Sequence, residues 1–345
     1  MSNLVSDLVS RGTKSVPAHF VRPVGDRPSV TEEEEGSSTG ESSFTMIDLQ
    51  GLHGPNRATI LNTIHEACKN DGFFLIKNHG IPDDVVNGMM EVSRDFFRLP
   101  ESERLKTYSE DTTKTVRLSC SFNVNKEEVG SWRDYLRLHC YPLEDHVRDW
   151  PSQPPSFRQV ASEYCTRVRN LALELLEALS ESLGLETNHL NDALGGHGQH
   201  MAINYYPPCP QPELTYGLPG HTDPNALTIL LQDDVPGLQV LKGGKWVRLN
   251  PIPKVFIVNI GDQIQVLSNG VYKSVLHRAL VNSERERISI PTFYCPSPDA
   301  VIRPADGLVD EHNPPLYRRY HYREYYESFW DHGLKDQSCI EKFTI

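Results

Sequence analysis

Three side chains in the second half of the chain have the types and the spacing of a metal-binding set. His221 and Asp223 stand two residues apart, directly after the turn-forming segment Gly-Leu-Pro-Gly, and 53 residues separate Asp223 from His277. Two imidazoles and one carboxylate leave further positions on a metal open, as in non-haem Fe(II) sites that handle O₂. A His-x-Asp pair alone is weak, because a chain with 14 His contains such pairs by chance. The third candidate ligand, His277, makes the prediction of a metal site more specific.

A second pair follows ten residues after His277. Arg287 and Ser289 belong to the apolar segment 287–293, where strand alternation places both side chains on one face. A guanidinium that points into a protein is costly unless an anion pairs with it. Its planar fork suits a carboxylate, and the serine adds a hydroxyl. The partner is either a bound carboxylate ligand or an internal Asp or Glu.

The segment 204–210, Asn-Tyr-Tyr-Pro-Pro-Cys-Pro, carries another candidate pair. Alternation sends Asn204 and Tyr206 to the same face of a strand, and both side chains end in hydrogen-bonding groups. They are therefore candidates for contacting a ligand. The alternative is a strand with packed tyrosines that runs into a proline-rich turn.

Together these motifs resemble the plant soluble 2-oxoglutarate- and Fe(II)-dependent dioxygenases. The likeness rests on the joint spacing of H-x-D, H and R-x-S and on the segment 204–223, and it extends from about residue 17 to the end. Segments such as WRDYLRLHCYP and RISIPTFYCPS make the chain similar to the downy-mildew-resistance-type oxygenases. The resemblance implies these roles: catalytic iron ligands at His221, Asp223 and His277; binding of the distal carboxylate of 2-oxoglutarate by Arg287 and Ser289; contact with this cosubstrate by Asn204 and Tyr206; and contact with the substrate by Phe293.

The resemblance also implies a reaction. It predicts an oxygenase that uses Fe(II), 2-oxoglutarate and O₂, with ascorbate as reductant, and that hydroxylates salicylic acid at C3, C5 or both. That activity would serve salicylate turnover and dampen plant defence. The alternative is flavone synthase or hydroxylase chemistry on flavanones.

The carboxylate of salicylate calls for a cationic partner. We predict Arg117 for this role, in a polar segment at 115–119 that is expected to act as a lid. Phe122 and Asn123 are the candidates for ring and hydroxyl contacts. The alternative for Arg117 is a solvated lid residue, because charged loop side chains usually face water.

Composition excludes several other classes of protein. The 345 residues hold 34 Lys and Arg against 46 Asp and Glu, a net charge of −12 that disfavours nucleic-acid binding. No apolar run is long enough to span a membrane, and the N-terminus lacks a secretory pattern. Seven scattered Cys without a C-x-x-C pair predict reduced thiols. Reduced thiols indicate a cytoplasmic and also nuclear setting, and we expect a monomer. The small phenolic substrate is what the family resemblance implies.

Periodicity places these residues on a scaffold. Helices are predicted at 57–70, 83–97 and 156–183, then about eight short strands between 201 and 302, then a helix at 322–330. The order predicts an α+β chain with a double-stranded β-helix (jelly-roll) core flanked by helices. We expect a largely flexible segment at 1–45, a helical and strand region that packs on the core at 46–190, the core at 195–310, and a C-terminal helix and tail at 311–345.

A jelly roll can also serve as a binding or storage protein. Such a protein has no need for two His and one Asp that converge beside an inward-facing Arg and Ser. Release of CO₂ that depends on iron and 2-oxoglutarate would distinguish the enzyme from the binding module.

Overall fold

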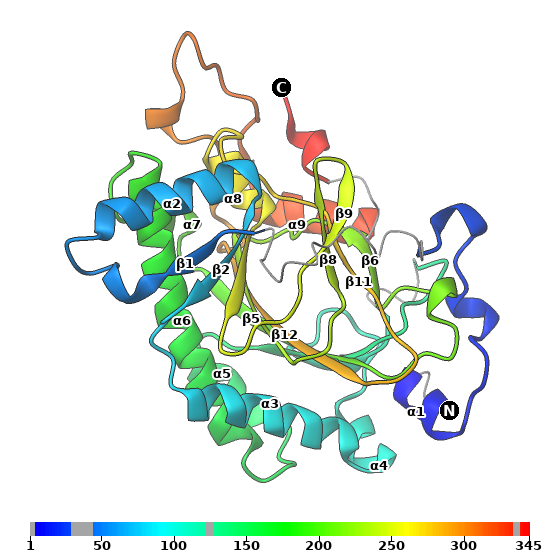
Figure 1. The fold of residues 1–345 in the computed structure, drawn as a ribbon. Coiled ribbons are helices and arrows are strands. Elements are labelled where there is room, and N and C mark those ends of the chain that lie inside the picture. The colour runs from blue at the N-terminus through cyan, green and yellow to red at the C-terminus, as the bar shows by residue number, and fades with distance from the viewer. Residues whose placement is uncertain (1–3, 29–43, 122–126, 334–338) are drawn as a thin grey trace.

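The computed structural model describes residues 4–28, 44–121, 127–333 and 339–345. Two β-sheets form its centre (Figure 1). The strands are β1 (Met46–Asp48), β2 (Phe73–Lys77), β3 (Val116–Ser119), β4 (Asp134–His139), β5 (Gly198–Tyr206), β6 (Leu218–His221), β7 (Leu227–Gln232), β8 (Leu238–Lys242), β9 (Lys245–Arg248), β10 (Phe256–Ile260), β11 (His277–Ala279), β12 (Arg287–Cys295), β13 (Val301–Ile302) and β14 (Tyr320–His321). The larger sheet has the order β1-β2-β10-β7-β12-β5-β4-β3, and the smaller has the order β6-β11-β8-β9.

The two sheets face each other across a cavity. Its walls come from β2, β5, β7, β10 and β12 of the larger sheet and from β6, β8 and β11 of the smaller one. The pairing is antiparallel along β10-β7-β12-β5-β4 and within the smaller sheet. This arrangement confirms the predicted α+β class with a jelly-roll core.

Helices cover the outer face of the larger sheet (Figure 1). They include α2 (Arg57–Asn70), α3 (Asp83–Arg98) and α6 (Phe157–Ser182). The other helices are α1 (Val5–Ser10), α4 (Glu101–Arg104), α5 (Leu143–His146), α7 (His189–Leu194), α8 (Asp262–Leu267) and α9 (Tyr322–His332). The long helix α6 buries Leu171, Leu175 and Leu179, which recur every four residues on one face. Each such leucine contributes about 1.5–3 kcal/mol by leaving water.

Alternation along β12 separates the core from the site. Ile288 and Ile290 belong to the same hydrophobic cluster as the α6 leucines. Arg287 and Ser289 point the opposite way and line the cavity between the sheets. One strand therefore holds both the packing face and two of the predicted site residues.

The N-terminal region does more than pack on the core. β1 and β2 extend one edge of the larger sheet, and β3 and β4 extend the other. Residues 116–119, which we expected within a lid, form strand β3 and pair with β4. Sheet pairing satisfies their backbone groups, and that pairing was not visible in the local sequence.

The expectation of a flexible segment over residues 1–45 is wrong for residues 4–28. Leu4 and Val5 are fully buried, and the backbone N–H groups of Val5 and Ser6 donate to the Asp134 carboxylate at 2.8 and 2.9 Å. Tertiary contacts thus order residues 4–28, although the composition of this stretch alone predicts little order. Residues 29–43 lie outside the described part.

Within the described residues, no helix is long and apolar enough to cross a membrane. All seven cysteines are buried free thiols, as predicted.

Candidate active site

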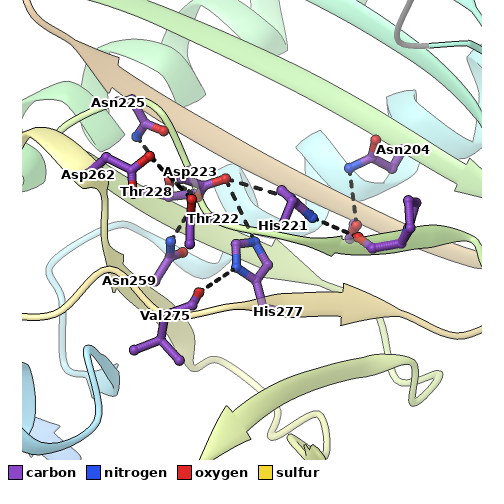
Figure 2. Close-up of polar contacts among 12 residues, drawn as sticks. Asn204, His221, Thr222, Asp223, Asn225, Thr228, Asn259, Asp262, Val275 and His277 are labelled. Carbon is purple, nitrogen blue, oxygen red and sulfur yellow. Dashed lines mark hydrogen bonds and ion pairs between the residues drawn. The ribbon is translucent and has the colours of Figure 1, made fainter. Parts of the chain in front are cut away.

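Sheet pairing brings the three predicted metal ligands together. His221 is the last residue of β6 and His277 the first of β11, and the two lie opposite each other in the register of this antiparallel pair. Asp223 follows β6 by two residues, and its Oδ1 lies 3.8 Å from Nε2 of His221 and 3.7 Å from Nε2 of His277. Figure 2 shows all three side chains pointing at one another. Among the described residues, this is the one His/Cys/Asp/Glu cluster with metal-site spacing.

Hydrogen bonds orient each of these groups toward a common point (Figure 2). Nδ1 of His221 lies 2.9 Å from the Pro219 carbonyl, and Nδ1 of His277 lies 3.2 Å from the Val275 carbonyl. Each carbonyl accepts a hydrogen bond from Nδ1–H, so the Nε2 lone pairs remain free to bind a metal.

The carboxylate of Asp223 is oriented in the same manner. Its Oδ2 accepts hydrogen bonds from Thr228 Oγ1 at 2.6 Å and from Asn259 Nδ2 at 2.8 Å. These two bonds leave Oδ1 directed at the histidines. The donor set of two imidazole nitrogens and one carboxylate oxygen therefore fits a divalent iron ion.

Electrostatics keep the ligands in their metal-binding forms. Burial, followed by the neighbouring His277, lowers the pKa of His221 to about 3, so this imidazole is neutral at physiological pH. Burial alone would raise the pKa of Asp223, but His277 and His221 outweigh it and lower that pKa below its ordinary value. A neutral imidazole and an ionised carboxylate are the forms that a metal requires.

A cavity of about 90 Å³ adjoins the ligands between the two sheets. Arg287, Ser289, Asn204 and Tyr206 all line it. The β5–β12 register sets Ser289 opposite Asn204 and Arg287 opposite Tyr206. The sequence placed these four residues on shared faces, and the sheet brings the two pairs together.

Arg287 as a whole is only 3% exposed. Its Nε donates to the Val235 carbonyl at 3.1 Å and its Nη2 to Gln232 Oε1 at 2.9 Å, while its guanidinium centre lies 5.2 Å from the Tyr206 ring. None of the ion pairs found among the described residues involves Arg287. No internal Asp or Glu is therefore in ion-pair contact with Arg287 there, although the Arg287 charge acts on the buried carboxyl of Asp233 and opposes the rise that burial causes in its pKa.

A larger cavity of about 130 Å³ shares the metal ligands His221 and Asp223 in its wall. Its other lining residues come from β4 and the residue before it, from β5, β6 and β12, from the segment 224–225 and from the C-terminal helix α9. Phe293, predicted beside the substrate, lines both cavities. The aromatic and charged residues that sequence reasoning missed on these walls are Arg133, Tyr135, Arg137, His200, Tyr326, Phe329 and Trp330.

No local signal marked those residues, apart from the segment WRDYLRLHCYP that supported the family resemblance. Arg133 and Arg137 occur there at an even spacing that alternation places on one face. The same spacing is found in many structural strands. That Arg133 and Arg137 line the same cavity is therefore evident only from the folded sheet.

The structure does not bring the predicted substrate residue Arg117 to the site, in contrast to the three predicted metal ligands. Arg117 is fully buried in β3 and is absent from the walls of both cavities. Its guanidinium donates to Tyr135 Oη, to Ser119 Oγ and to the carbonyl oxygens of Ser109 and Ser121. Its contact with a substrate stays a prediction. Phe122 and Asn123 lie outside the described residues.

Comparison with known protein families agrees with this geometry. Residues 197–296 match the 2OG-Fe(II) oxygenase superfamily, and residues 44–158 match the family described as non-haem dioxygenase in morphine synthesis N-terminal. The first match contains all three metal ligands together with Arg287 and Ser289.

Curated relatives cover the chain almost end to end. It is 60% identical to Protein DMR6-LIKE OXYGENASE 2 of Arabidopsis thaliana, over 99% of this chain and 97% of the relative. It is 49% identical to Protein DOWNY MILDEW RESISTANCE 6 of the same plant, over 99% of each chain. It is 52% identical to Flavanone 3-dioxygenase 2 of Oryza sativa subsp. japonica, over 95% and 94% of the two chains.

A solved structure agrees over the same length. The crystal structure of JOX2 in complex with 2OG, Fe and JA is 38% identical, covers 99% of this chain and 97% of its own, and superposes with a TM-score of 0.89. Sequence, fold and ligand geometry converge on one enzyme class that uses iron and 2-oxoglutarate. The chain belongs to the 2OG-Fe(II) oxygenase superfamily and is a dioxygenase of that family.

Proposed function

We propose that this dioxygenase hydroxylates salicylic acid at C3 or C5, giving a dihydroxybenzoic acid, and so acts in salicylate turnover. The observation that carries the proposal is the composition of the larger cavity beside the metal ligands. Phe293, Phe329 and Trp330 supply aromatic walls, and Arg133 and Arg137 supply buried positive charge. Aromatic walls with buried cations suit a small aromatic acid.

The assignment of the cofactor-binding residues follows from the same geometry. His221, Asp223 and His277 would hold Fe(II), since their free donor atoms all lie within 4.8 Å of one another. Arg287 and Ser289 would hold the distal carboxylate of 2-oxoglutarate through the unused guanidinium edge and the hydroxyl. Asn204 and Tyr206 would flank this cosubstrate.

The protein's part in the reaction is to position groups and exclude water. When bound, iron and 2-oxoglutarate together with O₂ supply the oxidising power that inserts oxygen into an aromatic C–H bond. Nη1 of Arg133 donates to Asn204 Oδ1 at 3.0 Å, and Asn204 Nδ2 lies 3.4 Å from Ser289 Oγ. This chain of contacts holds the cosubstrate side rigid. The aromatic side chains of α9 cover the substrate side and shield it from water.

A second candidate substrate class is the flavanones, with flavone synthase or hydroxylase chemistry. The specific observation in its favour is the 52% identity to a protein named Flavanone 3-dioxygenase 2. The aromatic walls of the cavity would also suit a flavanone ring. A flavanone has no carboxylate, however, and would leave the buried arginines without an anion.

Product analysis by mass spectrometry distinguishes the two. The enzyme is incubated with Fe(II), 2-oxoglutarate and ascorbate, in parallel with salicylate and with the flavanone naringenin. We expect succinate release coupled to 2,3- or 2,5-dihydroxybenzoate from the salicylate arm. Product from naringenin alone would favour the alternative. Succinate release that responds to neither substrate would contradict both assignments.

A further inference from the structure

The geometry points to Arg137 as the residue that binds the carboxylate of the substrate and thereby selects aromatic acids over neutral aromatic molecules. This inference rests on the proposed function only in taking the substrate to be an aromatic acid. It deepens that function by naming the specificity-determining residue and the orientation of the ring.

The first step is the position of Arg137 in the sheet. It lies in β4 opposite Ala202 of β5, and both line the larger cavity. Because Ala202 has a small side chain, it leaves room above the sheet for a ligand ring beside the guanidinium. The next pair on the same face of these two strands is His139 opposite His200, and His200 also lines this cavity. Arg137 therefore borders a space that the sheet itself leaves open.

The second step concerns the guanidinium of Arg137, which is both fixed and incompletely bonded. The residue is 9% exposed, and its Nη2 donates to the carbonyls of Thr112 at 2.7 Å and Lys114 at 2.6 Å. Its Nε is buried without a hydrogen-bond partner in the described structure. None of the ion pairs found among the described residues involves Arg137. A buried charge of this kind is costly unless an anion completes its environment.

The third step compares Arg137 with the other buried arginines. Arg104 pairs with Asp7 at 2.6 Å, and Arg278 donates to Gln239 and stacks over Trp246. Four groups already accept hydrogen bonds from Arg117 in β3. These arginines have structural partners and are absent from the walls of the larger cavity.

Arg133 is the second arginine on those walls, but its place is different. It lines both cavities and donates to Asn204, at the junction with the cosubstrate side. A substrate carboxylate held there would crowd the metal and the cosubstrate. Arg137 lines the larger cavity and is absent from the walls of the metal-side one. A carboxylate at Arg137 therefore leaves the aromatic ring between the guanidinium and the metal.

The orientation has a chemical consequence. With the carboxylate held away from the metal, the ring edge that faces the metal carries the positions meta and para to the carboxylate. The positions ortho to the carboxylate face back toward Arg137. For salicylate, C3 and C5 are both meta to the carboxylate, so this orientation agrees with the proposed products. It excludes hydroxylation at C6.

The test compares an acid with its neutral amide. Dissociation constants for salicylate and salicylamide are measured by calorimetry on the anaerobic holoenzyme with Fe(II) and 2-oxoglutarate, so that binding is seen without turnover. We expect the wild-type enzyme to prefer salicylate by about 10- to 100-fold, the range for hydrogen bonds to a charged group. Arg137→Gln should bring this ratio close to one by weakening salicylate binding, with salicylamide binding unchanged. An unchanged ratio in Arg137→Gln would overturn the inference.

Three further variants keep the result interpretable. Arg303→Gln removes an exposed arginine that pairs with Asp306, and it should leave the acid-to-amide ratio unchanged. Arg117→Gln tests the other predicted partner of the carboxylate, which lies opposite Arg137 across β3 and β4. Loss of the ratio in Arg117→Gln alone would transfer the role to Arg117 and overturn the inference. If Arg137→Gln loses both ligands, Arg137→Lys decides, because it keeps the charge without the fork. A reduced ratio with intact salicylamide binding supports the inference, and a wild-type ratio overturns it.

A second ligand pair, benzoate and benzamide, separates this inference from the proposed substrate. If salicylate is not turned over but the enzyme still prefers benzoate, and Arg137→Gln abolishes that preference, the salicylate assignment fails and the role of Arg137 stands. If the wild-type enzyme prefers neither acid over its amide, the role of Arg137 is refuted whatever is turned over.

Discussion

The two cavities of this dioxygenase meet at His221 and Asp223 but are built in different ways. Around the metal ligands, hydrogen bonds to Pro219, Val275, Thr228 and Asn259 orient the three side chains. In the larger cavity, the guanidinium groups of Arg133 and Arg137 each keep a buried Nε without a partner in the described structure. The first region is complete before any ligand binds, and the second has polar groups that a ligand would satisfy.

This difference separates two kinds of function. A preorganised metal side can perform the same chemistry on different substrates, because its geometry follows from sheet register and short turns. The walls of the larger cavity come from separate segments, including the C-terminal helix α9, and on the proposed function they would decide which molecule reaches the metal. Substitutions on the metal side should therefore abolish all turnover. Substitutions in the larger cavity should change the substrate while turnover of 2-oxoglutarate persists.

The largest expected effect is at the metal ligand Asp223. Asp223→Ala should lower substrate-dependent succinate release by more than about 100-fold, because even the loss of a group that orients a ligand costs about 10- to 100-fold. Iron content measured on the purified protein should fall in parallel. Asp306→Ala, which changes an exposed carboxylate, is the control. Retained turnover in Asp223→Ala would refute the ligand set.

The next effect concerns the cosubstrate. Arg287→Lys should raise the KM for 2-oxoglutarate about 10-fold with a smaller change in kcat, because a point charge replaces a fork that binds a carboxylate through two bonds. Steady-state kinetics at varied 2-oxoglutarate measures this change. Arg285→Lys, two residues away and exposed, should behave as wild type. An unchanged KM in Arg287→Lys would mean that the distal carboxylate binds elsewhere.

A smaller and more selective effect is expected at the cover of the larger cavity. Trp330→Ala should raise the KM for the aromatic substrate about 2- to 10-fold, the range for loss of one aromatic contact. Release of succinate without substrate should be unchanged, since Trp330 is absent from the walls of the metal-side cavity. Glu327→Ala on the exposed side of the same helix is the control. If Trp330→Ala lowered succinate release by the same factor with and without the aromatic substrate, the two cavities would not have separate roles.

The smallest effect is a pH dependence of stability at the stacked pair of His139 and His200, whose ring centres lie 4.0 Å apart. Burial, followed by Arg137 and His146, lowers the pKa of His139 to about 4. In the unfolded chain this pKa returns to about 6.5. Between these values the unfolded state binds a proton that the folded state does not, so stability falls as pH falls from about 6.5 to about 4.

The Tm of His139→Gln should therefore decrease less than that of the wild type between pH 7 and pH 5, as measured by thermal scans of the iron-free protein. His312→Gln changes an exposed histidine and should follow the wild type. Parallel curves for His139→Gln and the wild type would show that the pair does not contribute to the pH dependence.

Periodicity recovered the regular parts of the fold well. The helix predicted at 57–70 has those bounds in α2, and those predicted at 83–97 and 156–183 agree with α3 and α6 within one residue at each end. Each carries a long amphipathic pattern that tertiary packing reinforces. The strand predicted around His277 is shorter than expected, because only residues 277–279 pair with their neighbours. Strands β3 and β4 were missed, because charged residues interrupt their apolar pattern.

The sequence by itself determined the jelly-roll class and singled out the three residues that the structure brings together as a candidate metal site, with the Arg-x-Ser pair on the wall of the adjoining cavity. These features depend on residue types at fixed spacing and on local alternation, which survive in a linear chain. The tertiary structure alone decided which arginines face the larger cavity. It placed Arg117 among structural partners in β3 and left Arg133 and Arg137 facing the larger cavity. The physical reason is that the burial and pairing of a charge depend on strands and helices far apart in the chain, whose contacts no local pattern encodes.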